Sequence, residues 1–371
     1  MRYYIIAGEA SGDLHGSNLI KALKQKDTQA EVRAWGGDLM QAAGAEVVKH
    51  YRDLAFMGFV EVVANLRTIL GNLKRCKQDV KSFAPDALIL IDYPGFNMRI
   101  AEWAKAEGIK VIYYVSPQVW AWKQKRALKL KRTVDRMLCI LPFEPDFYKK
   151  FDWEVDYVGH PLLDAIANRP QFSASERLNS LGLSADKPVL ALLPGSRAQE
   201  IQTKLPIMLQ AAAQFPEMQA VIAMAPSQTE GFYQQFIGDA EVKLVNNRTY
   251  DLLEVTHAAM VTSGTATLET ALFNVPEVVC YKGNPLSYLI ARQLIKVNYI
   301  SLVNLIAGKE LVKELIQNEM TAKHIGVALK KLLNTDARAQ LINEYKALEA
   351  KLKGGSASAR AAEIIWEEVQ K

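Results

Sequence analysis

The stretch Ser263-Gly264-Thr265-Ala266-Thr267-Leu268-Glu269 follows the apolar run Ala258-Ala259-Met260-Val261. The apolar run predicts a short buried parallel strand, the small residues predict a tight turn, and Ala266 onward predicts a helix that faces a core. The free N–H groups of a first helical turn and the positive end of the helix dipole favour a phosphate. The stretch therefore predicts an α/β unit with a phosphate or diphosphate site.

Individual residues of this turn suit a nucleotide. Gly264 lets a ligand come close, and the hydroxyls of Ser263, Thr265 and Thr267 add donors. Glu269 lies about one turn into the predicted helix, where its carboxylate could accept hydrogen bonds from both hydroxyls of a ribose. An ordinary strand-to-helix connection capped by Ser and Thr explains the same residues, so the interpretation depends on the rest of the chain.

Length and charge narrow the class of protein. The chain has 371 residues, of which 50% are hydrophobic and 23% are charged. This length exceeds one typical core and favours two α/β domains. The net charge of +5 suits phosphate-bearing ligands or an anionic surface. It is far from that of a dedicated nucleic-acid binder, so we expect no nucleic-acid partner.

Cysteine usage and the N-terminus indicate the compartment. The three cysteines are widely separated, and neither C-x-x-C nor His-x-x-x-His spacing occurs. This pattern argues for a reducing compartment and against a structural metal. The N-terminus becomes polar too early for a signal peptide, and no apolar run approaches the ~18 residues of a membrane span. We expect a cytoplasmic protein, at most peripheral to a membrane, with no metal and no cofactor.

The N-terminal half opens with a strand over Tyr3–Ala7, the turn Gly8–Asp13 and a helix over Leu14–Lys26. This is the first βα unit of a doubly wound sheet. The turn G-E-A-S-G-D differs from G-x-G-x-x-G, which gives a nicotinamide dinucleotide little support. Glu9, Ser11 and Gly12 are predicted to line the N-terminal cleft, and neighbouring His15 receives no role.

A carboxylate follows the apolar strand predicted over Asp86–Ile91. Asp92 comes just past the carboxyl end of this strand, where open α/β sheets bind ligands. Pro94 and Gly95 fix a turn that holds Asp92 in place. Asp92 is therefore a candidate catalytic residue, and capping of the next helix is the alternative.

A helical stripe of apolar residues runs from Phe59 to Leu73. It is interpreted either as a core-packed helix or as an exposed face, flanked by cations, that rests on a bilayer. The membrane interpretation assigns this surface to five residues, which are Val62, Val63, Leu66, Ile69 and Leu70.

The strand predicted over Lys110–Val115 runs into Ser116-Pro117-Gln118-Val119-Trp120-Ala121-Trp122. Two tryptophans after a strand predict one wall of a cleft, with Ser116, Gln118 and Trp120 on the acceptor side; simple packing is the alternative. The basic run between Lys123 and Arg132 fits a solvated helix face, and equally fits anionic lipid head groups or a substrate phosphate.

The second half repeats this order of strand, turn and helix. It follows a connection over residues 162–186 in which the apolar residues are only weakly periodic. The strand predicted over Val189–Leu193 leads to the turn Pro194–Arg197 and to a helix over 199–215 that Pro206 interrupts. The guanidinium of Arg197 is placed to chelate two phosphate oxygens. Further strands are predicted over residues 220–223 and 241–245, and helices end the chain.

Two Rossmann-like parallel-sheet domains that face each other across a cleft, with C-terminal helices, describe a GT-B glycosyltransferase architecture. The predicted domains are 1–165 on the acceptor side, 166–350 for the UDP-sugar, and a terminal helix over 351–371 that packs back on an N-terminal domain. No D-x-D motif occurs, so the helix N-terminus and Arg197 would stabilise the leaving diphosphate without a metal. Asp92 would act as general base on an acceptor hydroxyl.

Several motifs in one order resemble the bacterial lipid-A-disaccharide synthases over nearly the whole chain. They are G-E-A-S-G-D at 8–13, M-G-F-V-E-V at 57–62, I-D-Y-P-G-F-N at 91–97, Y-V-S-P-Q-V-W-A-W at 114–122, L-P-F-E at 141–144, L-L-P-G-S-R at 192–197, S-G-T-A-T-L-E at 263–269 and S-L-V-N-L-I-A-G at 301–308.

The resemblance implies an inverting transfer of 2,3-diacylglucosamine from UDP-2,3-diacylglucosamine to 2,3-diacylglucosamine 1-phosphate. The products would be the β-1′,6-linked lipid A disaccharide 1-phosphate and UDP, formed at the cytoplasmic face of the inner membrane of a Gram-negative bacterium. By the same resemblance Asp92 matches the base, and Arg197, Ser263–Thr267, Glu269 and Asn304 match the UDP side. The resemblance also implies a peripheral lipid-binding surface and a homodimer that exchanges C-terminal parts.

Two other hypotheses stay open from the residues alone. A UDP-N-acetylglucosamine 2-epimerase of the same architecture would need no acceptor and no apolar surface. A catalytically idle nucleotide- or lipid-binding protein would bind UDP without releasing it from a donor.

Overall fold

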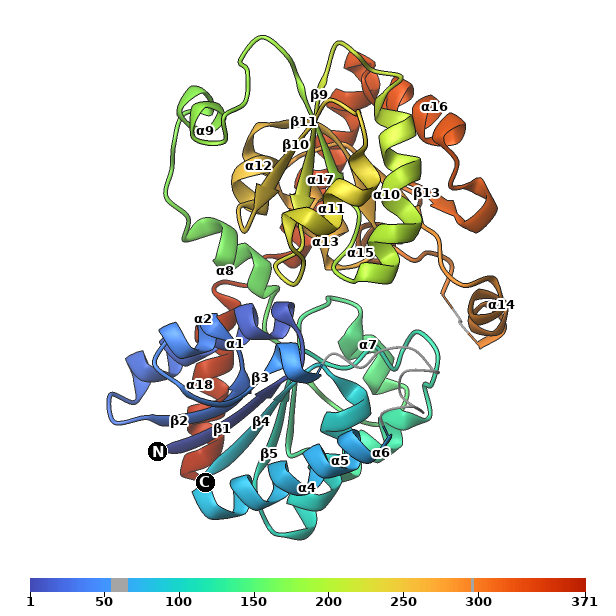
Figure 1. The fold of residues 1–371 in the computed structure, drawn as a ribbon. Coiled ribbons are helices and arrows are strands. Elements are labelled where there is room, and N and C mark those ends of the chain that lie inside the picture. The colour runs from blue at the N-terminus through green and yellow to red at the C-terminus, as the bar shows by residue number, and fades with distance from the viewer. Residues whose placement is uncertain (55–65, 295–296) are drawn as a thin grey trace. The chain divides into compact units, whose positions relative to one another are not determined.

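The computed structural model describes residues 1–54, 66–294 and 297–371, and its chain forms two α/β units (Figure 1). One unit consists of Met1–Arg169 together with Leu352–Lys371, and the other of Pro170–Lys351. The chain therefore leaves the first unit, completes the second and returns to the first with its last helix.

The first unit is built on a seven-stranded sheet of order β3-β2-β1-β4-β5-β6-β7, in which every described strand pair is parallel. The strands are β1 Arg2–Ala7, β2 Glu31–Gly36, β3 Glu46–His50, β4 Ala87–Ile91, β5 Val111–Tyr114, β6 Arg136–Cys139 and β7 Asp156–Tyr157. The helices are α1 Ala10–Lys26, α2 Asp38–Ala42, α4 Leu66–Phe83, α5 Pro94–Ala106, α6 Arg126–Thr133, α7 Glu144–Lys149, α8 Pro161–Ala167 and α18 Ala357–Gln370, with a short 3-10 turn η1 at Tyr51–Leu54.

The central strands β4 and β5 are buried along their whole length, as expected where helices cover both faces of a parallel sheet. In the register of β1 and β4, Ala7 lies opposite Ile91. The turns that follow these two strands therefore emerge side by side at the carboxyl edge of the sheet. This register brings Glu9 and Asp92 to the same edge.

Helix α18 packs against α1 within the first unit (Figure 1). The amide of Ser358 donates a 2.8 Å hydrogen bond to the Asp164 carboxylate, and Lys26 forms a 2.9 Å ion pair with Glu363. Ala357, Ala361, Ala362 and Ile365 provide the buried face of the helix. The end of the chain is therefore part of the core of the first unit.

The second unit is built on a six-stranded parallel sheet of order β10-β9-β8-β11-β12-β13. The strands are β8 Val189–Leu193, β9 Gln219–Met224, β10 Val242–Asn246, β11 Thr256–Thr262, β12 Glu277–Tyr281 and β13 Lys313–Ile316. The helices are α9 Ala174–Ser180, α10 Ala198–Ala212, α11 Glu230–Ile237, α12 Thr249–Val255, α13 Thr265–Leu272, α14 Pro285–Leu294, α15 Leu302–Ala307, α16 Ala322–Leu332 and α17 Thr335–Leu352, with a 3-10 turn η2 at Gln317–Glu319.

Alternate residues of the central strands in this unit enter two separate cores. Met260 and Cys280 pack with Ile201, Leu205 and Met208 of α10 on one face of the sheet. Val261 packs with residues of α12 on the other face of the sheet. The side-chain alternation of the strands thus decides which residues of β11 and β12 face α10.

Two sequence predictions need correction. Helix α1 begins at Ala10, so only Gly8 and Glu9 lie between it and β1. Helix α10 continues through Pro206, because its buried residues Ile201, Leu205 and Met208 pack on the sheet and offset the lost backbone hydrogen bond. The weakly periodic connection predicted over residues 162–186 contains the boundary between the two units, after Arg169. It also contains most of α8 and all of α9, which begins with a capping box between Ser173 and Glu176.

Candidate active site

Asp92 follows β4 at the carboxyl edge of the first sheet, and three hydrogen bonds fix its backbone. Its carbonyl oxygen accepts hydrogen bonds from the Asn97 side-chain amide at 2.8 Å and from the Tyr113 hydroxyl at 2.6 Å. Its amide donates to the carbonyl of Val115 at 3.3 Å. Asn97 and Tyr113 are both fully buried, so they fix the position from which the Asp92 carboxylate projects.

The backbone at this edge adopts rare conformations. Asp92 and Tyr93 have φ angles of 43° and 48°, and Val115 has a φ angle of 64°. Left-handed backbone is costly for residues with a side chain, most of all for a β-branched residue such as valine. Strain of this kind persists where surrounding contacts enforce it and clusters at functional sites. Pro94 at the start of α5 then leads directly into the helix.

The Asp92 carboxyl group has a shifted acidity. Burial away from water raises its pKa, the negative charge of Glu9 raises it further, and a hydrogen bond from the Tyr93 backbone opposes both, which leaves the pKa at about 7. A carboxylate with this pKa can take up a proton near neutral pH and is suited to general base chemistry.

The turn after β1 supports this site through close packing. A side chain at Gly8 would lie 2.4 Å from the ring of Tyr93, so the residue must be glycine for Tyr93 to pack there. Gly12 is buried in α1, where a Cβ would lie 3.0 Å from that of Ala7. Glu9 and Ser11 are half-buried. Of the predicted cleft residues in this turn, Glu9 and Ser11 are the ones whose side chains reach solvent.

Asp13, the last residue of the turn motif, is used inside the fold. Its carboxylate accepts hydrogen bonds from the backbone amides of Gly37 at 2.8 Å, Leu39 at 3.1 Å and Met40 at 3.0 Å. It therefore stabilises the N-terminus of α2 and joins the first two βα units.

In the segment after β5, two of the residues predicted for the acceptor side are buried. Trp120 is buried, packs edge-on against Phe143 and donates a 3.2 Å hydrogen bond to Glu144. Ser116 is also buried, and its hydroxyl lies 2.7 Å from that of Tyr148. Trp122, which is 43% exposed, is the tryptophan that faces solvent. Of the three residues predicted on the acceptor side here, Gln118 alone is exposed.

Glu144, to which the sequence pattern assigns no role, organises this segment. Its carboxylate also accepts hydrogen bonds from the amides of Ile140 at 3.2 Å and Leu141 at 2.9 Å. Burial raises its pKa to about 7, although these hydrogen bonds oppose the shift. In the sequence, only the position of Glu144 in the L-P-F-E motif sets it apart from other acidic residues.

The phosphate turn of the second unit has the predicted strand, turn and helix. Gly264 lies at the N-terminus of α13 and is exposed, and a Cβ built there would have no atom within 4 Å. The Thr267 hydroxyl donates to the Gly264 carbonyl at 2.9 Å, and the Ser263 hydroxyl donates to the Ile300 carbonyl at 3.0 Å. Those two protons stabilise the turn itself. Thr265 and Ala266, both half-buried, complete the first turn of the helix.

Glu269 lies one turn into α13 and is oriented by Tyr250. The Tyr250 hydroxyl donates a 3.1 Å hydrogen bond to its carboxylate. Burial raises the pKa of Glu269, and this hydrogen bond opposes the shift. A carboxylate held in this way can accept hydrogen bonds from two neighbouring hydroxyl groups.

Arg197 is the residue immediately before α10. Its guanidinium forms a 3.0 Å ion pair with Glu200, and the other Glu200 oxygen accepts a hydrogen bond from the Ser196 amide at 3.2 Å. Gly195 has a φ angle of 117°, and a Cβ there would lie 2.5 Å from the Glu200 carboxylate. The turn places a half-exposed cation at the carboxyl edge of β8, beside β11.

Asn304 is fully buried and its amide is occupied. Its nitrogen donates to Glu314 and to the Val312 carbonyl, both at 2.9 Å, and its oxygen accepts from the amides of Leu311 and Val312. Glu314 also accepts from the amides of Ile300 and Ser301. Asn304 therefore acts on the turn indirectly, through the segment whose Ile300 carbonyl receives the Ser263 hydroxyl.

The apolar stripe lies partly outside the described residues. Nothing is described of Val62 and Val63, nor of the side chain of Leu66. In the described part of α4, Leu70 is 54% exposed and Ile69 is half-buried.

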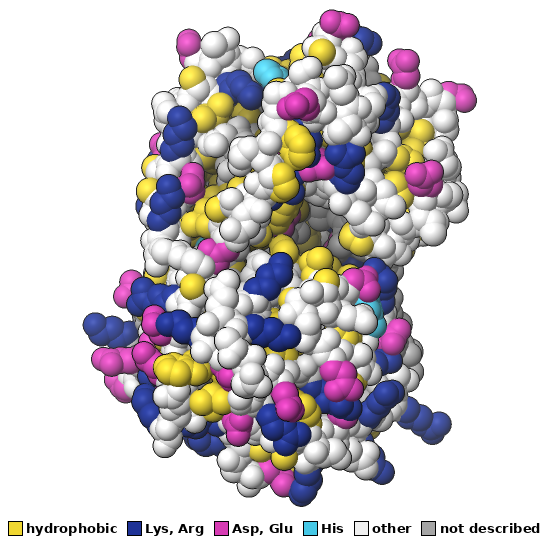
Figure 2. Space-filling view, turned by 90° about the vertical axis from the view of Figure 1, so that its left-hand side faces the viewer, with side chains coloured by type: hydrophobic (Ala, Val, Ile, Leu, Met, Phe, Trp, Pro, Cys, Tyr) yellow, Lys and Arg dark blue, Asp and Glu magenta, His cyan; other side chains and the backbone are white. Residues whose placement is uncertain are grey.

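On the face drawn in Figure 2, Lys and Arg side chains are interspersed with Asp and Glu, in keeping with the small net charge.

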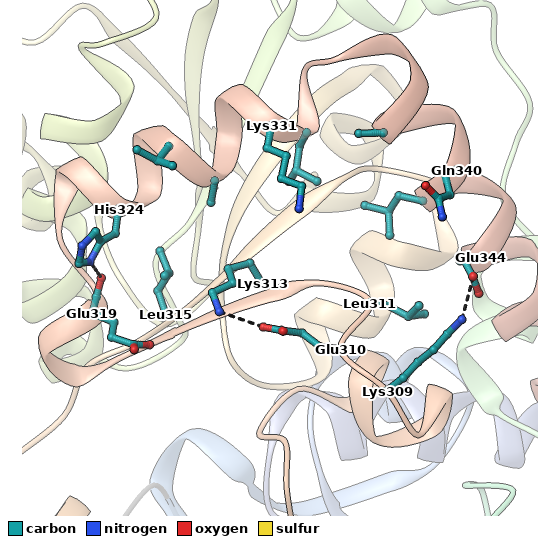
Figure 3. A pocket seen from close by; sticks show the side chains of 15 residues that line it. Lys309, Glu310, Leu311, Lys313, Leu315, Glu319, His324, Lys331, Gln340 and Glu344 are labelled. Atoms are coloured by element: carbon teal, nitrogen blue, oxygen red, sulfur yellow. Dashed lines mark hydrogen bonds and ion pairs between the residues drawn. The ribbon is translucent and has the colours of Figure 1, made fainter.

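A groove of about 660 Å³ lies in the second unit between β13, α16 and α17 (Figure 3). Lys309 forms an ion pair with Glu344 at 2.8 Å, and Lys313 forms one with Glu310 at 3.1 Å. Each of these charged groups in the lining therefore already has a partner of opposite charge. None of the predicted site residues lines this groove. We therefore assign it no part in the chemistry.

Residues 1–54, 66–294 and 297–371 contain neither a metal-binding cluster nor a membrane-spanning helix. No group of His, Cys, Asp and Glu side chains in these ranges could hold a metal ion. Every helix in them falls short of the length and apolarity that crossing a bilayer requires.

Comparison with known proteins identifies the family. The family model described as lipid-A-disaccharide synthetase matches residues 3–369. Lipid-A-disaccharide synthases from Syntrophus aciditrophicus and Geobacter metallireducens are 42% and 40% identical to this chain. These matches cover 96% of the chain and 95% of the first relative, and 99% of the chain and 97% of the second.

Solved structures with low sequence identity share the fold. A UDP complex of MnaA from S. aureus matches with a TM-score of 0.71 at 12% identity, covering 100% of this chain and 97% of that one. The glycotransferase of kitacinnamycin matches with a TM-score of 0.67 at 15% identity, covering 99% of each chain. These neighbours support the GT-B fold. With the full-length family match, the two parallel sheets and the motifs at their carboxyl edges, the chain belongs to the lipid-A-disaccharide synthase family of glycosyltransferases.

Proposed function

We propose that this protein transfers 2,3-diacylglucosamine from UDP-2,3-diacylglucosamine to 2,3-diacylglucosamine 1-phosphate, with Asp92 as the general base. The observation that carries the proposal is the Asp92 carboxyl group, which is fixed at the edge of β4 and has its pKa raised to about 7 by burial and by Glu9. The names of relatives that match over the full chain supply the reaction.

In the proposed step, Asp92 accepts the proton of the acceptor 6-hydroxyl. The hydroxyl oxygen forms a bond to the anomeric carbon of the donor, and the bond from that carbon to the UDP oxygen breaks with its electron pair leaving on UDP. Attack from the face opposite UDP inverts the anomeric centre and gives the β linkage. One proton moves to Asp92, and UDP departs.

The second unit supplies the groups proposed to bind UDP. The first turn of α13 offers backbone N–H groups and open space over Gly264. Arg197 provides a positive charge for the diphosphate, and Glu269, oriented by Tyr250, accepts hydrogen bonds from the ribose hydroxyls. Ser263, Thr265, Ala266 and Thr267 shape the turn, and Asn304 supports it through Glu314.

The first unit supplies the groups proposed for the acceptor. Glu9, Ser11 and Gln118 present side chains at the carboxyl edge of its sheet, while Gly12, Ser116 and Trp120 support that edge from within. Glu9 has a second role, because its charge helps to keep the Asp92 pKa near neutrality.

We also propose that the protein binds the cytoplasmic face of the inner membrane through the stripe that includes Ile69 and Leu70. The exposed Leu70 and the cations Arg67, Lys74 and Arg75 of α4 support this, because apolar and basic groups together favour an anionic lipid surface. A homodimer with exchanged C-terminal parts is a further proposal, which rests on the family alone.

The test is acceptor-dependent release of UDP by the purified protein in detergent. UDP should appear with UDP-2,3-diacylglucosamine only when 2,3-diacylglucosamine 1-phosphate is present, and a chelator should leave the rate unchanged. UDP release or epimerisation without acceptor would point to a 2-epimerase. Binding of UDP without release under any condition would point to an idle nucleotide-binding protein.

A further inference from the structure

Lys204 is a buried cation in the second unit that the proposed reaction has not used. It lies on the buried face of α10, between Ile201 and Leu205, and is only 2% exposed. Among the residues that the structure describes, it forms no hydrogen bond and no ion pair. An enclosed, poorly hydrated ammonium group without an anion lowers stability, so an anion bound beside Lys204 would be stabilising.

The neighbours of Lys204 place its ammonium group toward the carboxyl edge of the sheet. Helical side chains tilt toward the N-terminus of their helix, which here is the turn of Arg197 and Glu200. Lys204 interacts electrostatically with both, and with Cys280 at the end of β12. The backbone of Cys280 in turn accepts a 3.2 Å hydrogen bond from the Ser263 amide of the phosphate turn.

Glu200 offsets part of the charge of Lys204, but it forms no ion pair with it. The two Glu200 oxygens are engaged by the Arg197 guanidinium and by the Ser196 amide. Burial raises the pKa of Cys280 to about 12, so its thiol is uncharged at neutral pH. Burial also lowers the pKa of Lys204 itself, with Arg197 adding to the shift and Glu200 opposing it. Lys204 can therefore still pair with an anion that the chain itself does not provide.

A second polar group on the same face also lacks a partner. The hydroxyl of Thr262 is buried and has no hydrogen-bond partner among the described residues, and Thr262 is only 6% exposed. Thr262 is the register partner of Cys280, so both side chains project to the face that α10 covers. Thr262 also directly precedes Ser263 of the phosphate turn. Lys204 and Thr262 thus both lie on the face of the sheet that α10 covers, and Thr262 adjoins the phosphate turn.

We propose that Lys204 and Thr262 form a second contact for the diphosphate of the nucleotide donor, in which the ammonium and hydroxyl groups both donate to diphosphate oxygens. The inference rests on the proposed function, because it needs a nucleoside diphosphate at Ser263–Thr265. With Arg197 it gives the leaving diphosphate two fixed cations, which is one way to stabilise its charge without a metal.

The experiment compares the binding of UDP and of uridine by calorimetry in the full chain. Lys204→Met should weaken UDP binding about ten- to a hundredfold, the range expected for loss of a hydrogen bond to a charged group, and leave uridine binding unchanged. It should also raise the Tm of the ligand-free protein, because it removes an uncompensated buried charge. Thr262→Val, which keeps the shape of the side chain, should weaken UDP binding by a smaller factor.

Lys330→Met is the matched control, since it removes the same charge from an exposed position on α16. It should leave both affinities at the wild-type value. Wild-type UDP binding in Lys204→Met, with a lowered Tm, would show a purely structural lysine and overturn the inference. If Lys204→Met fails to fold, Thr262→Val alone tests the inference. Unchanged UDP binding in Thr262→Val would then overturn it. Failure of the wild-type protein to bind UDP would instead overturn the proposed function.

Discussion

The hydroxyl of Tyr113 donates a 2.6 Å hydrogen bond to the backbone carbonyl of Asp92. Tyr113 belongs to β5 and Asp92 follows β4, so the contact joins neighbouring strands at the edge where the proposed chemistry occurs. It stabilises a backbone in a left-handed conformation, which is less favourable than the β or right-handed helical region for a residue with a side chain. The carboxylate owes its position to this contact and to Asn97.

Tyr113→Phe should therefore impair catalysis without removing any group that touches substrate. We expect a loss of about 1 kcal/mol in the free energy of unfolding and a fall in kcat on the order of tenfold, with little change in KM. Tyr114→Phe on the same strand is the control, because Tyr114 makes no hydrogen bond to Asp92. Equal kcat values for the two variants would argue against a positioning role for Tyr113.

The pH dependence of the reaction should follow the Asp92 carboxyl group. A general base must be deprotonated, so kcat/KM should rise with pH through the pKa of about 7 and then level off. Glu9→Gln removes a negative charge that raises this pKa, and should move the rising limb to lower pH. A limb that keeps its position in Glu9→Gln would contradict the electrostatic coupling of the two carboxylates.

Asn304 should prove to be a structural residue. Asn304→Ala leaves donors and acceptors of the Glu314 network without partners, so we expect a loss of about 2 kcal/mol or more in the free energy of unfolding. UDP binding, measured well below the Tm, should change by less than about tenfold, because the effect on Ser263 is indirect. An unchanged Tm combined with loss of UDP binding would mean that Asn304 contacts the donor.

The lipid surface can be tested on the described end of the stripe. The double substitution of Ile69 and Leu70 by Ser should reduce flotation with anionic liposomes and leave the Tm close to wild type, since Leu70 is 54% exposed. Val327→Ser is the control, because Val327 is 63% exposed on α16 of the other unit. A collapse of the Tm would assign the stripe to the core.

The sequence predicted the parts of the fold that depend on local pattern. Strands such as β1, β8 and β11 are apolar runs that end in small or polar residues, so period and turn chemistry sufficed to find them. The edge strand β13, with the sequence Lys-Glu-Leu-Ile, carries no comparable signal, and pairing with β12 decides its structure. At Pro206 tertiary packing outweighs a local helix breaker, so the local pattern wrongly predicts an interrupted helix.

For the candidate site, too, local sequence pattern predicts only part of what the structure shows. Asp92 and the Gly264 turn follow predicted strands, so their place at a sheet edge could be predicted from sequence. The partners of Asp92, Glu269 and Ser263 could not, because Tyr113, Tyr250 and Ile300 come from other segments of the chain. The buried Trp120 donates its hydrogen bond to Glu144, 24 residues further along the chain, and no local pattern reveals this partner.

The most direct test of the account is the rate of acceptor-dependent UDP release by Asp92→Asn, measured alongside its affinity for UDP. We predict a loss of ~10²–10⁴-fold in rate, as for removal of a general base, with UDP affinity unchanged. Because the folded state raises the Asp92 pKa, ionisation of this group lowers stability as the pH rises through about 7, so the variant should melt no lower than wild type at pH 8. A folded variant that binds UDP and turns over at a near-normal rate would contradict the assignment of Asp92 as the base.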